Sequence, residues 1–491
     1  METNNRPPAH DSAKTHRTAD VVVIGAGTAG LAAYRAATAV TANVLLIEGG
    51  THGTTCARVG CMPSKLLLAA AEVSHHAAHG QPFGVNAQVH IDGRAVMDRV
   101  RRERDRFVSF VLDSVDRIPE AHKIHGKARF VGPRTVIVNN QTITAKSVVI
   151  ATGSSPFVPP VLAAAGDRLV VNDDVFSWET LPSSVAVFGS GVIGLELGQA
   201  LARLGVRVRI FGRSGTVGPL TDPVVKGAAQ KAFEAEFPLH NDAPVSQVRR
   251  VDAGSTGEPG VEVTFTLDGE VRTEFFAYAL VAAGRRPNLG KLGLEATDLS
   301  LDEHGVPVFD RSTLQCGNTP IFIAGDANHD IPLLHEAADE GKIAGENAAR
   351  FPKVVPGPRR SPLSITFTDP QLAVVGANFA TLSECLAAQG GPVIGSVSFE
   401  DQGRSRVMLQ NRGACRVYAD PSTGRFLGAE MAGPRAENIG HLLAWAHQQD
   451  LTIDRMLSMP FYHPVVEEGI RTALRDASAQ LVNRANAAVG G

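Results

Sequence analysis

The chain has 491 residues, a formal net charge of −3, 44% hydrophobic residues and five cysteines. This length is too great for one hydrophobic core and predicts about three domains. Acidic and basic residues are interspersed, so the charge gives no reason to expect a nucleic acid or an acidic membrane as partner, and the scattered cysteines exclude a disulfide framework.

The N-terminal segment, residues 1–18, is polar and lacks the apolar core of a secretory signal. We predict that it is a disordered tail. The sequence contains no run of about 18 apolar residues, so we expect no membrane span and a cytoplasmic protein.

A glycine-rich motif follows the first apolar run. A strand over residues 21–24 leads into a G-x-G-x-x-G pattern, and then come an Ala-rich helix and a second strand that ends at Glu48. The pattern alone is weak, but this strand, helix and terminal acid form the full dinucleotide-binding context. The glycines let the backbone approach a pyrophosphate, and Glu48 can accept hydrogen bonds from a ribose. The glycines are Gly25, Gly27 and Gly30.

Two cysteines, Cys56 and Cys61, precede Pro63 and an apolar run over residues 66–71 that predicts the start of a helix. A helix N-terminus favours a thiolate, and Pro63 suits the first helical turn. Such a pair can cycle between dithiol and disulfide. The alternatives are two buried cysteines that never meet, or half of a zinc site, although zinc sites usually show closer spacing and a second ligand pair. The spacing alone favours redox chemistry only slightly.

The dinucleotide pattern returns in the middle of the chain. A strand over residues 185–188 precedes a second glycine motif, and a helix and another strand follow it. Two such units predict two bound dinucleotides. The glycines of this second motif are Gly189, Gly191 and Gly194.

With these motifs the chain resembles the class I pyridine nucleotide-disulfide oxidoreductases, the family of dihydrolipoamide dehydrogenase, glutathione reductase and mercuric reductase. The resemblance runs from about Ala19 to Leu474 and rests on motifs in the family's order. These are residues 25–30, 56–65, 151–153, 189–194, 283–288, 323–326 and 463–464. It implies an α/β fold with two Rossmann-like dinucleotide-binding domains and a C-terminal α+β dimerisation domain, with FAD on the first unit and NAD or NADP on the second.

The resemblance also implies domain boundaries. After the tail, we expect an FAD-binding domain over residues 19–157, an NAD(P)-binding domain over 158–288, a return to the FAD domain over 289–351, a Pro-rich linker over 352–363 and a dimerisation domain over 364–491. We expect the last helix of that domain to span residues 468–475.

Four residues carry the chemistry that the resemblance implies. Cys56 would be the interchange thiol that meets the substrate, and Cys61 the sulfur next to the flavin. His463 would be the acid–base group, oriented by Glu468 five positions later. In this family the histidine comes from the partner subunit, which implies an obligate homodimer.

Other residues would hold the cofactors. Lys65 would lie near the flavin and pair with Glu196, and Asp326 would hold the ribitol. The remaining cofactor-binding residues that we expect are Gly126, Thr152, Gly153, Ser154, Arg213 and Gly284. We expect no metal site.

The leading functional interpretation is oxidation of dihydrolipoamide to lipoamide, with electrons passing through a Cys56–Cys61 disulfide and FAD to NAD or NADP. The partner would be lipoamide, another small dithiol or disulfide, or a lipoyl domain of a dehydrogenase complex. One alternative is an NADPH-dependent reductase of glutathione or another small disulfide, which Arg35 favours. Another is a mainly structural flavoprotein subunit of a dehydrogenase complex.

Three positions depart from the leading interpretation. NAD-dependent members place an acid after the second strand of the nicotinamide unit, but here Gly212 and then Arg213 follow. An arginine without an acid suits a 2′-phosphate, although Arg213 equally fits a surface loop. Phe461 stands where dihydrolipoamide dehydrogenases usually have a histidine. Arg58, between the cysteines, could favour the thiolate or simply point to solvent.

Overall fold

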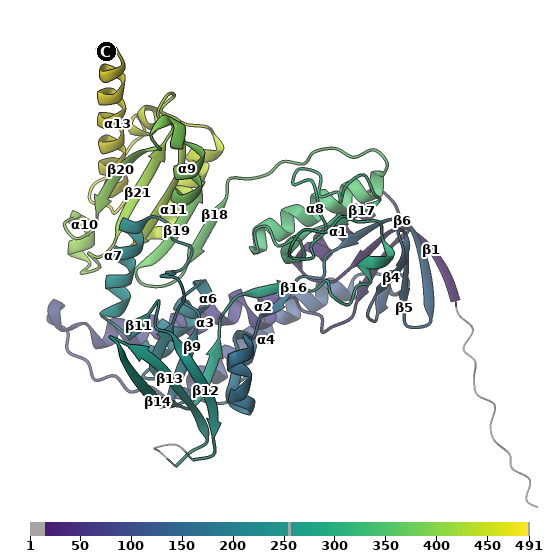
Figure 1. Ribbon diagram of the computed structural model, residues 1–491, viewed down its shortest axis with the longest axis horizontal. Helices are drawn as coiled ribbons and strands as arrows, with labels where there is room; N and C mark the ends of the chain where they lie inside the picture. The colour runs from purple at the N-terminus through teal and green to yellow at the C-terminus, as the bar shows by residue number, and fades with distance from the viewer. Residues whose placement is uncertain (1–14, 254–256, 490–491) are drawn as a thin grey trace, which may run out of the picture. The chain divides into compact units, whose positions relative to one another are not determined.

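The computed structural model describes residues 15–253 and 257–489 (Figure 1). The chain forms two compact units. The first comprises Met1–Arg58, Asp105–Ser155 and Arg285–Arg359, and the second comprises Val59–Arg104, Pro156–Gly284 and Arg360–Gly491. Residues 59–104, which we placed in the FAD domain, therefore group with the segments expected to bind the nicotinamide nucleotide and to form the dimer.

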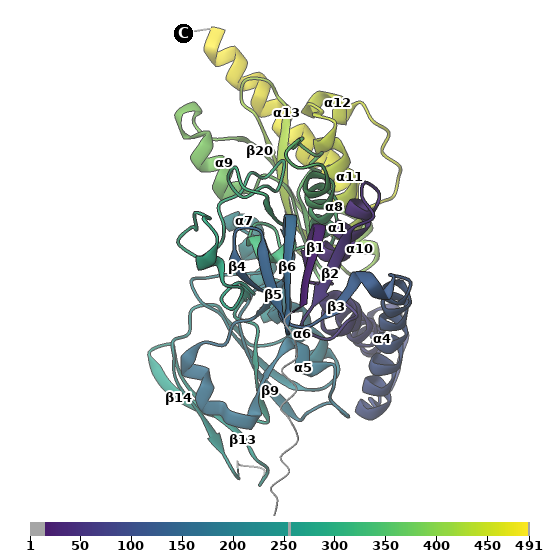
Figure 2. The ribbon, with the colours of Figure 1, turned by 90° about the vertical axis from the view of Figure 1, so that its right-hand side faces the viewer.

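The first unit is built on a seven-stranded sheet with the order β3-β2-β1-β6-β5-β4, and β17 also pairs with β6 (Figure 2). β1 runs parallel to both β2 and β6, whereas β4, β5 and β6 are antiparallel. The strands are β1 (Thr15–Ile24), β2 (Val44–Glu48), β3 (Lys123–His125), β4 (Arg129–Gly132), β5 (Thr135–Val138), β6 (Gln141–Ile150) and β17 (Ile321–Ile323).

Side chains that alternate along β1 supply a separate core to each face of this sheet. Val21 and Val23 belong to the core that includes α1 (Thr28–Thr38) and α8 (Leu334–Arg350), two helices that lie side by side (Figure 1). Val22 and Ile24 belong to the core on the other face. Because both faces are covered there, residues 21–24 of this strand form a continuous apolar run.

The structure corrects the predicted N-terminal tail. Residues 1–14 lie outside the described part, but residues 15–18 extend β1 and pair with residues 141–144 of β6. Threonines such as Thr15 and Thr18 suit an extended ladder. The prediction weighed apolar content only, so it missed this polar end of the strand.

In the second unit, a parallel sheet with the order β11-β10-β9-β15-β8 follows the Rossmann pattern. One of its faces shares a core with α3 (Cys61–Ala78) and α6 (Val192–Arg203), and the other with a three-stranded antiparallel sheet. The parallel strands are β8 (Leu169–Val171), β9 (Ser184–Phe188), β10 (Arg207–Phe211), β11 (Leu239–His240) and β15 (Tyr278–Val281); the antiparallel ones are β12 (Val245–Val251), β13 (Gly260–Leu267) and β14 (Glu270–Phe276).

The C-terminal part of this unit is a five-stranded antiparallel sheet with the order β18-β19-β22-β21-β20. Its core is shared with α11 (Ala436–Gln448) and α13. α13 begins at the predicted Glu468 but runs to Val489, well past the predicted end at residue 475. The strands are β18 (Leu363–Thr366), β19 (Gln371–Gly376), β20 (Val393–Ser398), β21 (Ala414–Ala419) and β22 (Phe426–Gly433). None of the described helices is both long and apolar enough to cross a membrane.

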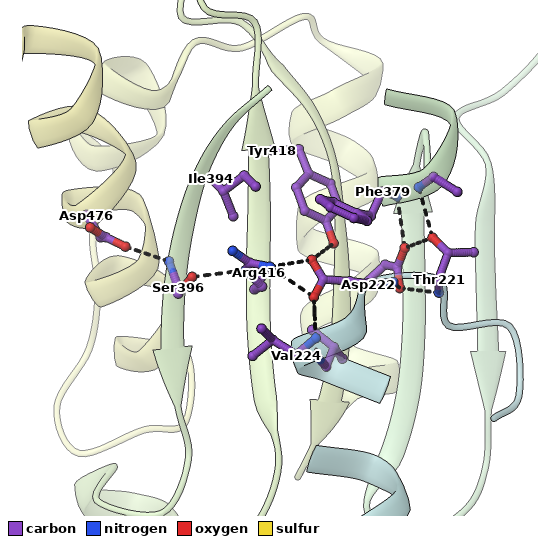
Figure 3. Close-up of polar contacts among 12 residues, drawn as sticks. Thr221, Asp222, Val224, Phe379, Ile394, Ser396, Arg416, Tyr418 and Asp476 are labelled. Atoms are coloured by element: carbon purple, nitrogen blue, oxygen red, sulfur yellow. Dashed lines mark hydrogen bonds and ion pairs between the residues drawn. The ribbon is translucent and has the colours of Figure 1, made fainter. Parts of the chain in front are cut away.

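Helix α7 (Pro223–Glu234) is fastened to the C-terminal sheet by a buried carboxylate at its N-cap (Figure 3). Asp222 is fully buried and accepts hydrogen bonds from Arg416 Nη1 at 3.0 and 3.1 Å and from Tyr418 Oη at 3.0 Å. Burial raises the pKa of Tyr418, so its hydroxyl stays protonated and can donate. The same carboxylate caps the helix through Val224 N at 2.9 Å.

Glu430 of β22 holds the segment just before this helix. Its buried carboxylate accepts hydrogen bonds from Thr221 N at 2.7 Å, Thr221 Oγ1 at 2.6 Å, Asp222 N at 2.9 Å and Phe379 N at 2.9 Å. Two buried carboxylates therefore fix where α7 begins.

A second polar network lies near α3 and α6. Arg203, with 6% of its side chain exposed, pairs with Glu236 at 2.8 Å and with Asp369 at 2.9 Å, and Arg412 pairs with the same two acids. Possible ligand atoms of His75, Glu236 and Asp369 lie within 4.8 Å of one another. Because two guanidinium groups already neutralise both carboxylates, we interpret the cluster as an ion-pair network and not as a metal site.

His75 makes stability depend on pH. Burial, and then the charge of Arg203, lowers the pKa of His75 from 6.5 to about 4. Between pH 6.5 and pH 4, the ring is neutral in the folded chain but protonated in the unfolded chain. The contribution of the ring to the free energy of unfolding is therefore complete above pH 6.5 and is lost as the pH falls toward 4. Between pH 7 and pH 5, we expect the free energy of unfolding in urea to fall by on the order of 1 kcal/mol more in the wild type than in His75→Gln.

The matched control is His76→Gln, at the exposed neighbouring position of the same helix. It should behave like the wild type. An equal loss in the wild type and in His75→Gln would contradict the assignment.

Candidate cofactor and redox site

The first glycine loop lets a ligand approach the backbone. A Cβ atom added to Gly25 would lie 2.2 Å from Ala151 O, and one added to Gly30 would lie 1.8 Å from Gly25 O. Any side chain at these positions would push the loop away from the sheet. A Cβ at Gly27, by contrast, would meet no atom within 4 Å. α1 begins at the next residue, and the N–H groups of a helix N-terminus next to open space suit a phosphate.

Glu48, at the end of β2, forms hydrogen bonds with the backbone of this loop and of the residues that follow β2. One carboxylate oxygen accepts a hydrogen bond from Ala26 N at 2.6 Å, and the other accepts one from Gly50 N at 2.7 Å. Each oxygen keeps a further lone pair, so the carboxylate can also accept hydrogen bonds from ribose hydroxyls. The backbone of Gly126 lies beside that of Glu48, because Gly126 N donates to the backbone carbonyl oxygen of Glu48 at 2.8 Å.

The structure brings together predicted polar residues that follow two neighbouring strands, β6 and β17. Ser154 Oγ donates to Asp326 Oδ2 at 2.7 Å and accepts from Arg285 Nε at 2.8 Å. Thr152 Oγ1 is buried and has no hydrogen-bond partner among the described residues, and a Cβ at Gly153 would meet nothing within 4 Å. A buried hydroxyl without a partner beside an open glycine fits a polar ligand such as a flavin nucleotide.

The two cysteines lie on two successive helices. Cys56 is half-buried on α2 (Thr55–Val59) in the first unit, and Cys61 is exposed and opens α3 in the second. α3 begins at Cys61, and Pro63 lies in its first turn, as predicted. At this N-terminus the helix dipole favours a Cys61 thiolate. The disulfide between the two cysteines stays a prediction.

The predicted pair of Lys65 and Glu196 is present. Lys65 Nζ lies 2.7 Å from Glu196 Oε2, and the Glu196 side chain is only 5% exposed. The other carboxylate oxygen accepts a hydrogen bond from Phe367 N at 2.9 Å, and Lys65 Nζ lies 4.5 Å from the centre of the Phe367 ring. Sequence reasoning missed Phe367, because no local pattern connects it to α3 or α6.

The second glycine loop repeats the geometry of the first. A Cβ at Gly189 would lie 2.2 Å from Ala282 O, one at Gly194 would lie 1.8 Å from Gly189 O, and one at Gly191 would meet nothing within 4 Å. α6 begins at the residue after Gly191. Gly284, at a φ of +101°, also has open space around it. The chain therefore contains two equivalent cradles for a dinucleotide.

His463 and Glu468 form the predicted contact. His463 Nδ1 lies 3.1 Å from both carboxylate oxygens, and this hydrogen bond lowers the pKa of Glu468. If Nδ1–H donates to the ionised Glu468, Nε2 keeps a lone pair that can accept a proton. The His463 side chain is 80% exposed, so Nε2 can reach a group outside this chain.

Three side chains whose roles the sequence left open have local contacts. Arg35 is exposed on α1 and donates to Ser114 Oγ at 2.5 Å. The Arg58 side chain contacts the position where Gly53 lacks a Cβ. The guanidinium carbon of Arg471 lies 6.0 Å from the centre of the Phe461 ring. Arg213 is exposed in the loop after β10.

Comparison with known proteins gives two family matches that together cover most of the chain. Residues 19–341 match the model described as pyridine nucleotide-disulphide oxidoreductase, and residues 363–474 match the dimerisation domain of the same group. A dihydrolipoyl dehydrogenase of Halobacterium salinarum is 29% identical over 95% of this chain and 98% of its own length. A mercuric reductase of Shigella flexneri is 31% identical over 92% of this chain and 80% of its own length.

Solved structures give the same fold. LpdA of Mycobacterium tuberculosis has a TM-score of 0.77 and 25% identity, over 94% of this chain and 99% of that one. The HOCl-induced flavoprotein disulfide reductase RclA of Escherichia coli has a TM-score of 0.75 and 21% identity, over 93% of this chain and 99% of that one.

The Lys65–Glu196 pair gives a stability prediction. In Glu196→Gln, an amide donor faces the Lys65 ammonium and the buried negative charge is lost. We expect the free energy of unfolding in urea to fall by about 1 to 3 kcal/mol. As control, Glu179→Gln removes an acid whose side chain is 81% exposed and 3.9 Å from Arg94, and should cost less than about 0.5 kcal/mol. Equal losses of unfolding free energy in the two variants would show that the buried pair stabilises the fold no more than an exposed one does.

Proposed function

Since the chain belongs to the pyridine nucleotide-disulphide oxidoreductase family, we propose that it oxidises dihydrolipoamide to lipoamide and passes the electrons to NAD or NADP. The observation that carries the proposal is the His463–Glu468 contact, which gives a dithiol substrate the base that thiol–disulfide exchange requires. The pair of Cys56 and Cys61 supplies the disulfide. Without such a base, a neutral thiol would be a poor nucleophile near pH 7.

Family members use FAD and a nicotinamide nucleotide, and these groups, when bound, supply the two-electron acceptor chemistry. The residues of this chain fit both. The open positions at Gly27 and Gly191 suit two pyrophosphates, and the buried Thr152 hydroxyl and the Asp326 carboxylate suit the polar edge of a flavin nucleotide.

In the proposed exchange, one thiol of dihydrolipoamide attacks Cys56 Sγ of a Cys56–Cys61 disulfide. The bond between the two cysteines breaks, Cys61 leaves as a thiolate, and a mixed disulfide forms between the substrate and Cys56. The second substrate thiol then displaces Cys56 and closes the lipoamide ring. Two electrons have moved to the cysteine pair. His463 accepts the proton of the first attacking thiol, and the proton of the second substrate thiol passes to the Cys56 sulfur as it leaves.

We infer that this base acts across a homodimer. Residues 363–474 match a dimerisation domain, and His463 projects from this part of the chain with most of its ring in solvent. A C2 dimer gives each site the histidine of the other subunit. Analytical sedimentation should find a dimer. A catalytically active monomer would contradict the proposal that each site uses the histidine of the other subunit.

The alternatives differ in substrate. A reductase of glutathione or another small disulfide would run the exchange in reverse with NADPH, and the exposed Arg35 could contact an acidic disulfide. The mercuric reductases among the relatives make Hg²⁺ a third candidate substrate. In a mainly structural subunit, the isolated protein would turn over none of these substrates.

The first test is a steady-state assay of purified, FAD-loaded protein. We expect dihydrolipoamide to reduce NAD or NADP faster than NADPH reduces glutathione disulfide or Hg²⁺ in parallel reactions. A protein that ignores dihydrolipoamide but consumes NADPH with one of the other substrates would overturn the leading proposal and identify the alternative.

Substitutions test the assigned roles. His463→Gln removes the base and should lower dihydrolipoamide turnover by roughly 100-fold to 10,000-fold. Cys56→Ser should abolish that turnover. Reduction of the flavin by NAD(P)H, followed by its absorbance, should persist in both variants because it requires neither group. Unchanged dithiol turnover in either variant would refute its role.

A further inference from the structure

The end of β10 cannot supply an acid to a ribose. A Cβ at Gly212 would lie 2.3 Å from Ser190 Oγ and 2.9 Å from Asn241 Cα. Ser190 Oγ donates to Thr216 O at 2.6 Å, which ties the following loop over this position. Glycine is therefore the residue that this packing admits. The carboxylate that would bind a ribose 2′-hydroxyl in an NAD-dependent Rossmann domain has no room here.

Two basic side chains accompany this loop. Arg213 follows Gly212, and Lys226 lies in the first turn of α7, where Lys226 N donates to Asp222 O at 2.9 Å. Lys226 Nζ lies 3.9 Å from the Cβ position of Gly215, within the loop. Lys226 is half-buried, and neither Arg213 nor Lys226 forms an ion pair with another described residue. One acid, Asp242, also faces the loop and accepts a hydrogen bond from Gly215 N at 3.1 Å.

A polar group that lacks a partner lies beneath the same loop. Asn241 is 6% exposed, and its side-chain oxygen and nitrogen both lack a hydrogen-bond partner among the described residues. It follows the two-residue strand β11, which pairs with Ile210 and Phe211 at the end of β10. Dinucleotides bind outside the carboxyl ends of such strands. A buried amide without a partner at this edge indicates a polar ligand there.

We propose that Lys226 is a second basic contact, with Arg213, for the 2′-phosphate of NADP, and that the chain therefore prefers NADP over NAD. The proposal deepens the proposed function and rests on it. The phosphate is a dianion that a guanidinium can bind in a bidentate manner and an ammonium can bind as a point charge. Two cations against the single Asp242 leave the loop with a net positive charge.

The anchoring of α7 explains how a lysine can serve this role. Asp222, held by Arg416 and Tyr418 (Figure 3), is the N-cap of the helix, and Lys226 N donates to Asp222 O in its first turn. The Lys226 backbone is therefore held in place before any nucleotide binds. Less conformational entropy is lost when a pre-positioned lysine contacts a phosphate.

The decisive measurement needs neither the nicotinamide nor a disulfide substrate. We would titrate the FAD-loaded protein by calorimetry with adenosine 2′,5′-bisphosphate and, separately, with AMP, which lacks the 2′-phosphate. The wild type should bind the bisphosphate more tightly. Lys226→Met should weaken bisphosphate binding by about 10-fold to 100-fold and leave AMP binding within about 2-fold.

Three further variants sharpen the test. Lys226→Arg should restore most of the bisphosphate affinity, and Asp242→Asn should raise it by removing a repulsive charge. Lys231→Met, on the same helix with its side chain 80% exposed, should change nothing. The proposal is overturned if Lys226→Met weakens both ligands equally, or neither, or if the wild type binds AMP as tightly as the bisphosphate. Because no disulfide is turned over, these outcomes stay separate from a failure of the lipoamide assignment.

Discussion

The buried carboxylate of Asp222 is the interaction on which the arrangement of the second unit depends. A carboxylate removed from water is costly unless it is paired and hydrogen-bonded. Here hydrogen bonds from the Arg416 guanidinium, the Tyr418 hydroxyl and the N–H groups at the start of α7 offset that cost. Glu430 adds a second fully buried carboxylate whose bonds are to backbone N–H groups and a hydroxyl. The parallel sheet and the C-terminal sheet are therefore joined by buried groups, and removing one partner alone would leave a buried charge uncompensated.

The predicted pairs differ in how they are placed, and the difference matches their roles. Glu196 is almost fully buried and bonds to both Lys65 and the backbone of Phe367, so it holds elements together. Glu468 bonds to a histidine that is largely in solvent, so it orients a ring that remains accessible. Under the proposed function, a carboxylate near a basic group would be structural in one place and chemical in the other, and the exposed fraction of the basic partner, 33% for Lys65 and 80% for His463, separates the two cases.

The glycine loops could be predicted from the residues themselves, whereas the pair of Lys65 and Glu196 and the contact of His463 with Glu468 could be predicted only through the family resemblance. Glycine is sterically required where a Cβ would lie 2.2 Å from a carbonyl oxygen, so the fold leaves a local signature there. The contact of Asp222 with Arg416 joins residues 194 positions apart and leaves no such signature. Likewise, the polar start of β1 and the far end of α13 are decided by what they pack against, which a local pattern does not contain.

The two glycine loops match each other in the clearances at all three glycines. Loops with identical geometry carry no information about which dinucleotide occupies them. Identity must be encoded at the ends of the neighbouring strands, where one unit has the carboxylate of Glu48 and the other has the glycine at position 212. Under the proposed assignment, the loops would supply affinity for both dinucleotides in common, and a few side chains outside the loops would supply selectivity. An evolutionary change of nucleotide could therefore proceed at those strand ends without disturbing either cradle.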